Sequence, residues 1–260
     1  MKHTFAICAY KESPYLESCI DSIINQTVKS DIIVSTSTPC DYIKNMCNKY
    51  NIPCYVNEGE RGITQDWNFA YSKCKTKYVT IAHQDDLYFE KYTENMLKIM
   101  EEENRPLIFF SDYFEVRNDI LLKENLNLKI KRILLSPLKM KCTRNSKWIR
   151  RRILAMGCSI CCPSVTFARE NLPEIIFNNH FRTDEDWEAW EKISKFNGAF
   201  LYCSKALVGH RIHEESETTA TIKETGRSDE DYEMFCKFWP KFFAKILTKL
   251  YSISEKSNEI

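Results

Sequence analysis

The chain has 260 residues, 43% of them hydrophobic and 13% aromatic, which is enough for one large packed core and excludes a disordered chain. Its formal net charge of +1 predicts neither nucleic-acid nor membrane affinity for the molecule as a whole. We expect no secretory signal, because no N-terminal stretch combines a basic start, an apolar run and a small-residue cleavage site. We also expect no membrane span, since no apolar run reaches eighteen residues. The 12 cysteines lie mostly in apolar runs and are predicted to be free thiols in a reducing cytosol.

Buried strands alternate with amphipathic helices over the first 112 residues. Strands are predicted at 3–10, 31–37, 52–56, 77–83 and 106–112, and helices at 13–27, 40–50, 63–74 and 88–103. This alternation predicts an α/β fold with an open, mostly parallel sheet covered by helices. In such sheets ligands bind beyond the carboxyl ends of the strands.

The second half of the chain is less regular. Residues 119–155 are predicted to be helical, and the stretch from Lys123 to Arg152 carries eleven basic residues against one acid. A strand is predicted at 161–169, a helix at 183–196, and short strands at 199–203 and 206–213. An amphipathic C-terminal helix at 228–251 is expected to be bent or interrupted at Pro240.

We predict a catalytic domain over residues 1–227 and a C-terminal helix and tail over 228–260. Within the domain, residues 1–112 form a nucleotide-binding half, 113–156 a basic helical insertion, and 157–227 an acceptor or catalytic half.

Two adjacent aspartates, Asp85 and Asp86, follow the buried strand 77–83 at its C-terminal tip. Carboxylates at this edge can hold a divalent cation through oxygen ligands. The alternative is that Asp86 caps the helix that follows, and both can hold at once.

Two further clusters carry polar groups. Glu185 and Asp186 open a predicted helix, where the helix dipole favours acids and capping is the ordinary explanation. His213 becomes a candidate metal ligand if a cation lies at Asp85, and an imidazole favours a transition metal over magnesium. Arg211 could neutralise a phosphate.

These pieces occur in a recognisable order. The stretches AICAYKESPYLESCIDSIINQT, DIIVSTS, NEGERGITQDWNFAYSKCKTKYVTIAHQDD, TDEDWEAW and HRIHEESET together resemble glycosyltransferase family 2, over about residues 3–219. The resemblance implies the GT-A fold and inverting transfer of a sugar from a nucleotide-diphosphate donor, usually a uridine one. It also implies help from Mn²⁺ or Mg²⁺.

The resemblance assigns roles by position. Asp85 matches the metal-binding second acid of the D-x-D signature, His213 a position near the metal or diphosphate, and Asp186 the general base, with Glu185 beside it. Contacts with the nucleotide sugar are expected from Ala9, Tyr10, Glu12, Ser35, Ser37, Asp66, Asn68, His83, Asp85 and Arg211. Two positions depart from the family pattern: His83 replaces the first acid of D-x-D, and the second strand is followed by no acid until Asp41.

We therefore expect an inverting, metal-dependent glycosyltransferase of the hexosyl type in the cytoplasm, acting on a glycan or lipid-linked acceptor in surface polysaccharide or glycoconjugate synthesis. One alternative is a sugar nucleotidyltransferase, although the segment after the first strand lacks the glycine-rich phosphate loop expected of one. Another is a non-catalytic nucleotide- or sugar-binding module.

A second hypothesis concerns the basic residues. The basic segment predicts contact with a lipid-diphosphate acceptor or with an anionic membrane, peripheral to its inner face, against the alternative of an ordinary solvated surface. The C-terminal helix could assist as interfacial helices do, or simply pack against the domain. Its basic and apolar residues are Lys237, Lys241, Lys245 and Lys249 beside Phe238, Trp239, Phe242 and Ile246.

Overall fold

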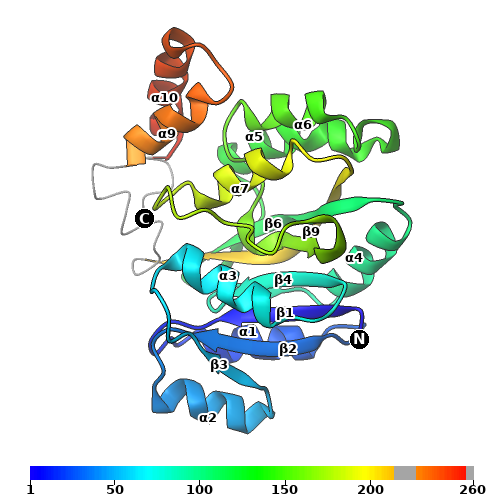
Figure 1. Cartoon of the computed structure of the whole chain (residues 1–260), viewed down its shortest axis with the longest axis vertical. Coiled ribbons are helices and arrows are strands. Elements are labelled where there is room, and N and C mark those ends of the chain that lie inside the picture. Colours follow the sequence, from blue (N-terminus) through cyan, green and yellow to red (C-terminus); the bar gives the residue numbers. More distant parts are fainter. Residues whose placement is uncertain (214–226, 256–260) are drawn as a thin grey trace.

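The computed structural model describes residues 1–213 and 227–255, which are built around one nine-stranded sheet (Figure 1). The strands follow the order β3-β2-β1-β4-β8-β6-β9-β5, with β7 paired to β6. Their bounds are β1 (His3–Cys8), β2 (Asp31–Thr36), β3 (Cys54–Val56), β4 (Tyr78–His83), β5 (Leu87–Tyr88), β6 (Pro106–Arg117), β7 (Ile120–Leu122), β8 (Val165–Ala168) and β9 (Ala199–Ile212).

The sheet has two halves of different character. Strands β3, β2, β1 and β4 pair in parallel, as the alternating pattern predicts. Strand β8 then runs antiparallel to both β4 and β6, while β6 and β9 are parallel to each other. The parallel half therefore places the carboxyl ends of β1, β2 and β4 at a common edge.

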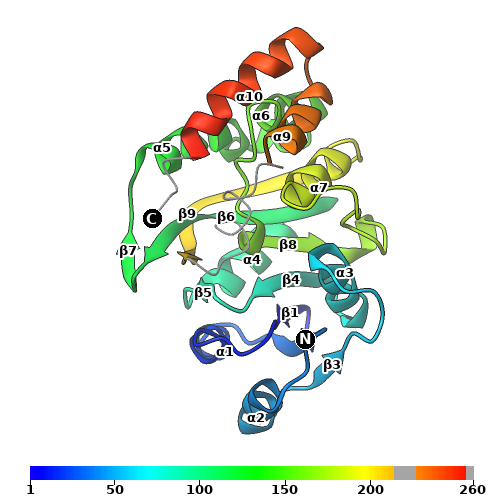
Figure 2. The same cartoon turned by 90° about the vertical axis from the view of Figure 1, so that its left-hand side faces the viewer.

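Helices cover both faces of the sheet (Figure 2). Alternate residues of β1 show why: Phe5 and Ile7 enter one apolar cluster, and Ala6 enters the other. The helices are α1 (Leu16–Ile24), α2 (Asp41–Tyr50), α3 (Ile63–Lys73), α4 (Tyr92–Glu101), α5 (Leu126–Leu135), α6 (Lys147–Leu154), α7 (Glu185–Ile193), α9 (Arg227–Cys236) and α10 (Lys241–Glu255).

Three predicted boundaries are wrong. Residues 119–122 are not helical: Asn118 and Asp119 both have positive φ and form a two-residue turn that joins β6 to β7. The strands predicted at 199–203 and 206–213 are one long strand, β9, whose register against β6 shifts near Asp112. The helix predicted to start at residue 88 starts at Tyr92, since Leu87 and Tyr88 pair with β9.

The C-terminal helices pack onto the rest of the molecule. The C-terminal helix is interrupted near Pro240, as predicted: α9 ends at Cys236 and α10 begins at Lys241. Phe235 of α9 meets Trp187 of α7 edge to face at 5.0 Å, and Trp239 Nε1 donates to the Ala155 carbonyl at 2.7 Å. None of the helices described here is both long enough and apolar enough to cross a bilayer.

Candidate active site

Three strand ends meet at the carboxyl edge of the parallel half. Cys8 at the end of β1 pairs with Ser35 of β2 on one side and with His83 of β4 on the other. The Ala9 amide then donates to the Ser35 carbonyl at 2.8 Å. The residues predicted to face the nucleotide from three separate segments therefore lie at one edge.

The segment after β1 is held by its backbone. The Gln84 side chain accepts from the Tyr10 amide and donates to the Tyr10 carbonyl, both at 3.0 Å. Lys11 has a positive φ of 55°, and its amide donates to Thr38 Oγ1 at 2.6 Å. The Tyr10 and Glu12 side chains remain exposed. The backbone of residues 10–11 is thus held by hydrogen bonds, while the side chains of Tyr10 and Glu12 are exposed where the nucleotide is predicted to bind.

Asp66 joins three segments below this edge. Its carboxylate accepts from Ser37 Oγ at 2.6 Å and from Asn57 Nδ2 at 2.7 Å. Asn68, two residues later on α3, instead binds backbone between β8 and α7. Its amide donates to the Phe177 carbonyl at 2.8 Å and accepts from the Ile176 and Phe177 amides. Among the described contacts, Asn68 therefore positions a loop, whereas Asp66 orients Ser37.

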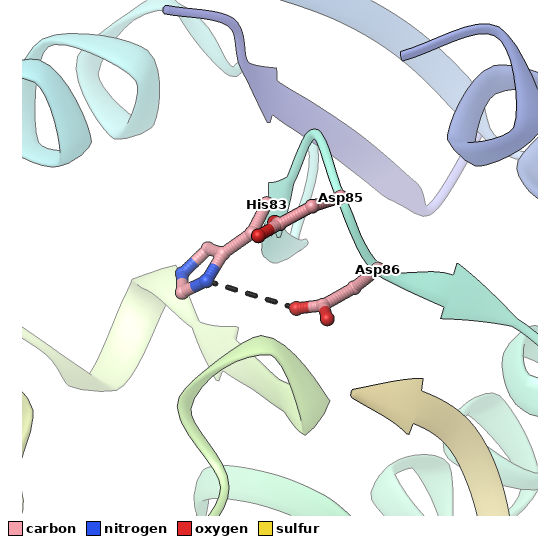
Figure 3. Close-up of side chains that lie close together, drawn as sticks. All are labelled: His83, Asp85 and Asp86. Carbon is pink, nitrogen blue, oxygen red and sulfur yellow. Dashed lines mark ion pairs between the residues drawn. The ribbon is translucent and has the colours of Figure 1, made fainter. Parts of the chain in front are cut away.

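The turn after β4 gathers three possible metal ligands, His83, Asp85 and Asp86 (Figure 3). One ligand atom of each lies within 4.8 Å of the others, and all three side chains turn toward the same region. His83 Nδ1 and Asp86 Oδ2 are 3.7 Å apart. Neither His83 Nε2 nor Asp86 Oδ2 has a hydrogen-bond partner among the described residues. The two carboxylates suit Mn²⁺ or Mg²⁺, and the imidazole favours a transition metal over magnesium.

Asp86 does not cap α4, contrary to the alternative interpretation, because that helix begins only at Tyr92. Asp86 is fully buried, and its Oδ1 accepts from the Arg211 amide at 2.8 Å and lies 3.0 Å from His210 Nδ1. Burial alone would lower the pKa of His210, but the Asp86 carboxylate raises it above its usual value. Asp86 thus fixes the end of β9 against the turn.

Asp85 faces His213, the residue that directly follows β9. His213 Nε2 lies 3.0 Å from Asp85 Oδ2, and Arg211 Nε donates to the Asp85 carbonyl at 2.9 Å. Burial alone would raise the pKa of Asp85, but the hydrogen bond with His213 and the nearby His83 and His210 rings lower it. Asp85 is therefore ionised at neutral pH, as a metal ligand must be.

A depression of about 290 Å³ opens beside Asp85. The Arg211 guanidinium lies 4.2 Å from the centre of the Tyr15 ring and donates to Asp119 Oδ1 at 2.5 Å. The lining residues are Tyr15, Asn118, Asp119, Arg211, Ile212 and His213. The Arg211 guanidinium is already paired with the Asp119 carboxylate here, so an anionic group would bind Arg211 by replacing that carboxylate, which is 83% exposed.

Two residues near this turn escaped the sequence interpretation. The Trp67 ring, from α3, stacks on His83 with centroids 5.0 Å apart and planes at 16°. Lys131 of α5 donates to Tyr113 Oη at 3.1 Å, and the Tyr113 ring lies 6.1 Å from that of His210. Neither contact can be predicted from the spacing of residues along the chain. Trp67, however, lies between Asp66 and Asn68 and could have been proposed as a site residue together with them.

Glu185 and Asp186 occupy the first turn of α7, as predicted. Asp186 Oδ1 accepts from the Trp187 amide at 2.6 Å, and Cys158 Sγ donates to Oδ2 at 3.5 Å. Burial raises the pKa of the Cys161 thiol, and the charges of Asp86 and Asp186 raise it further. Of the cysteines near this helix start, Cys158 is the one that contacts Asp186 directly.

No pair of cysteines forms a disulfide in this structure. All twelve are free thiols, as predicted. Within residues 1–213 and 227–255, His83, Asp85 and Asp86 are the only group of three metal-ligating side chains close enough to share an ion. Cys158 and Cys161 have a CxxC spacing in the sequence, but they belong to no group of potential metal ligands among the described residues.

Comparison with protein families and curated relatives gives one consistent result. Residues 4–157 match the sequence model of the family described as glycosyl transferase family 2. An uncharacterised glycosyltransferase of Rickettsia typhi is 23% identical over 97% of this chain and 74% of its own length. One from Methanocaldococcus jannaschii is 24% identical over 92% of this chain and 84% of its own length.

Solved structures give the fold. S. aureus TarS in complex with UDP-GlcNAc has a TM-score of 0.66 at 13% identity, covering 95% of this chain and 70% of that one. A mannosyltransferase from Pyrobaculum calidifontis in complex with GDP-Man and Mn²⁺ has a TM-score of 0.65 at 14% identity, covering 99% and 73%. The predicted GT-A-type α/β fold is confirmed.

Proposed function

Since the chain belongs to glycosyltransferase family 2 and is a glycosyltransferase, we propose that it transfers a hexose from a nucleotide-diphosphate donor with inversion at the anomeric carbon. The observation that carries this proposal is the group His83, Asp85 and Asp86 at the end of β4, with His213 against Asp85. A uridine donor is our first choice, and the UDP-GlcNAc bound by TarS supports it. The GDP-Man bound by the archaeal mannosyltransferase makes a guanosine donor the alternative to test.

The donor would lie along the carboxyl edge of the sheet. We assign the base and ribose to Ala9, Tyr10 and Glu12 after β1, and to Ser35 and Ser37 at the end of β2. Asp66 would orient Ser37 through their hydrogen bond. Asn68, expected near the nucleotide, would act by holding the loop at residues 176–177.

The metal would be Mn²⁺, with Mg²⁺ as the second choice. Asp85 and His213 would hold it, joined by His83 in place of the usual first acid and by the unpartnered Oδ2 of Asp86. When bound, such a cation neutralises charge on the departing nucleoside diphosphate. Arg211 adds a fixed positive charge beside it, where developing anionic oxygens gain most from preorganised partners.

The acceptor hydroxyl needs a base, because it is a poor nucleophile until its proton begins to leave. We assign this role to Asp186, with Glu185 orienting the acceptor. As the proton moves to Asp186, the acceptor oxygen bonds to the anomeric carbon and the bond from that carbon to the diphosphate oxygen breaks. One such displacement inverts the anomeric configuration.

The acceptor would be a glycan or a lipid-linked sugar in surface polysaccharide or glycoconjugate synthesis, with the enzyme in the cytoplasm, peripheral to the inner face of the membrane. A sugar nucleotidyltransferase would release pyrophosphate instead. A non-catalytic binding module would release neither product.

The decisive experiment offers purified protein UDP- and GDP-hexoses with Mn²⁺ and separates the products. We expect release of a nucleoside diphosphate, slow with water and faster with acceptor, and a strongly reduced rate of release in Asp85→Ala at the same Mn²⁺ concentration. Pyrophosphate release would establish the nucleotidyltransferase, and tight donor binding without any release would establish the binding module.

A further inference from the structure

The exposed face of α10 carries an apolar stripe that nothing in the described structure covers. The helix packs through Ala244, which is fully buried, and through Thr248, Leu247 and Tyr251. On the opposite side lie four large apolar side chains, with exposed fractions of 72% for Phe242, 53% for Phe243, 45% for Ile246 and 60% for Leu250. At 100° per residue these four fall within about a third of the helix circumference. Scattered exposed apolar residues are ordinary, but a continuous stripe of this kind marks an interaction surface.

A stripe of lysines runs along one flank of this apolar face. Lys241, Lys245 and Lys249 repeat every four residues, so they stack one above another on the helix. No acid occurs from residue 241 to 250, and no described carboxylate forms an ion pair with these lysines. The face is therefore apolar with a purely basic border.

A second exposed aromatic side chain lies on α6, close to the residue that precedes α10. The Arg152 guanidinium lies 5.9 Å from the centre of the Trp148 ring and 5.6 Å from that of Trp239, just ahead of α10. Trp148 is 69% exposed. Figures 1 and 2 both place α6, α9 and α10 at the end of the molecule away from α2. An exposed Trp with an arginine beside it is the side-chain pair that favours the headgroup region of a bilayer.

We propose that this face of α10, with Trp148, docks on an anionic lipid surface. As in other interfacial helices, the apolar stripe would enter the boundary between headgroups and acyl chains, and the lysines would contact the anionic headgroups. The set of residues expected to insert into the membrane also differs from the one predicted from the sequence. Phe238 stacks on Trp187 and on the Arg151 guanidinium, so Phe243 and Leu250 take its place. This docking is separate from the proposed donor chemistry, because it can be measured without any donor.

The test sediments the protein with vesicles of phosphatidylcholine alone or mixed with phosphatidylglycerol at low salt. We expect partition into the anionic vesicles only, with a loss of roughly fivefold for each lysine removed in Lys241→Gln, Lys245→Gln and Lys249→Gln. The double variant Phe242→Ser with Leu250→Ser should lose at least tenfold in partition. Ile175→Ser, which removes another apolar side chain, 61% exposed, should bind as the parent does.

The melting temperature of each variant shows that it is folded, and sedimentation velocity without lipid gives its oligomeric state. Equal, weak partition of the parent protein into both vesicle types overturns the proposal. So does unchanged partition of the folded Phe242→Ser, Leu250→Ser variant. If that variant instead converts an oligomer to a monomer, the stripe is a contact between copies of this chain and the lipid proposal is wrong.

Discussion

At the scale of single residues, the assignment of Asp186 as general base can be separated from a structural role. Asp186→Asn keeps the oxygen that accepts from the Trp187 amide, so the melting temperature should change little. Turnover should fall by about 10²–10⁴-fold, since general-base catalysis typically contributes that much. Donor affinity, measured by titration with Mn²⁺ present, should stay within a few-fold of the parent. A folded variant with near-normal turnover would exclude Asp186 as the base.

The neighbouring aspartates after β4 should behave differently from each other. Chelator should abolish transfer and Mn²⁺ restore it, and Asp85→Ala should raise the Mn²⁺ concentration needed while leaving stability nearly unchanged. Asp86→Ala removes a fully buried acceptor from the Arg211 amide and His210, so it should also cost about 1–3 kcal/mol of unfolding free energy. Activity against Mn²⁺ concentration and urea unfolding of both variants check this contrast. Equal stability losses would show that the two carboxylates are not divided in this way.

Only part of this site could be predicted from the sequence. The ends of parallel strands meet at one edge by geometry, so the order of strands and helices along the chain is enough to place Ala9, Ser35 and Asp85 together. The role of Asp86 could not be predicted, because its partners lie 124 and 125 residues away while the nearest helix start suggested a cap. The stack of Trp67 on His83 likewise depends on how α3 packs, which no local spacing reports.

At the scale of elements, Glu101 in the last turn of α4 fastens this helix to the starts of two strands. Its carboxylate accepts from Lys2 Nζ at 2.5 Å, from Tyr78 Oη at 2.5 Å and from Lys77 Nζ at 3.2 Å. The hydrogen bond from Lys2, followed by that from Tyr78, lowers the pKa of Glu101 to about 2. The native state therefore favours the ionised form, and this contribution to stability is complete above the usual value of 4.5 and is lost as the pH falls through about 2.

Glu101→Gln should accordingly lower the melting temperature most at neutral pH, by the equivalent of about 1 kcal/mol or less because the group is partly exposed. The difference from the parent should shrink below pH 4.5 and disappear near pH 2. Thermal unfolding across this pH range measures it. Glu102→Gln is the control, since the described contacts of Glu102 include one distant pair with Lys141, at 3.4 Å. A difference that stays constant with pH would refute the linkage.

The predicted elements succeeded where periodicity was strong and failed where it was interrupted. Helices α1 to α3 show regular apolar spacing, and each was anticipated within a few residues. Strand β9 was divided in two because Ser204 and Lys205 are exposed and polar, where the pairing with β6 shifts register instead of ending. The turn at Asn118 and Asp119 is missed because the sequence pattern predicts a helix from residue 119 onward.

At the scale of the whole molecule, part of the basic segment is engaged in contacts within the fold. Of its eleven cations, six donate to acids, to Tyr113 or to backbone carbonyls. These six are Lys129, Lys131, Arg132, Lys141, Arg150 and Arg151. The charge excess of this segment therefore does not by itself indicate an anionic partner, whereas α10 and Trp148 present an exposed apolar and basic surface.

Arg150 gives the clearest test of this structural role. It is 1% exposed and donates to the carbonyls of Ser194, Phe196 and Gly198, which joins α6 to the end of α7 and the start of β9. Arg150→Ala leaves these carbonyls without their donor and should cost about 3 kcal/mol or more in urea unfolding. Lys147→Ala on the same helix should stay within about 0.5 kcal/mol. Similar small effects for both would mean that the basic helices pack loosely.

The pairing of Asp86 with the end of β9 also has a kinetic consequence. The two halves of the site, residues 83–86 and 210–213, are separated by more than a hundred residues of chain, and β9 lies between β6 and β5 in the sheet. Closing so long a loop is entropically costly, and contacts of high sequence separation slow folding. A newly synthesised chain therefore carries both aspartates long before it carries their partners, and the ability to bind a donor should arrive late in folding, with the docking of this one strand.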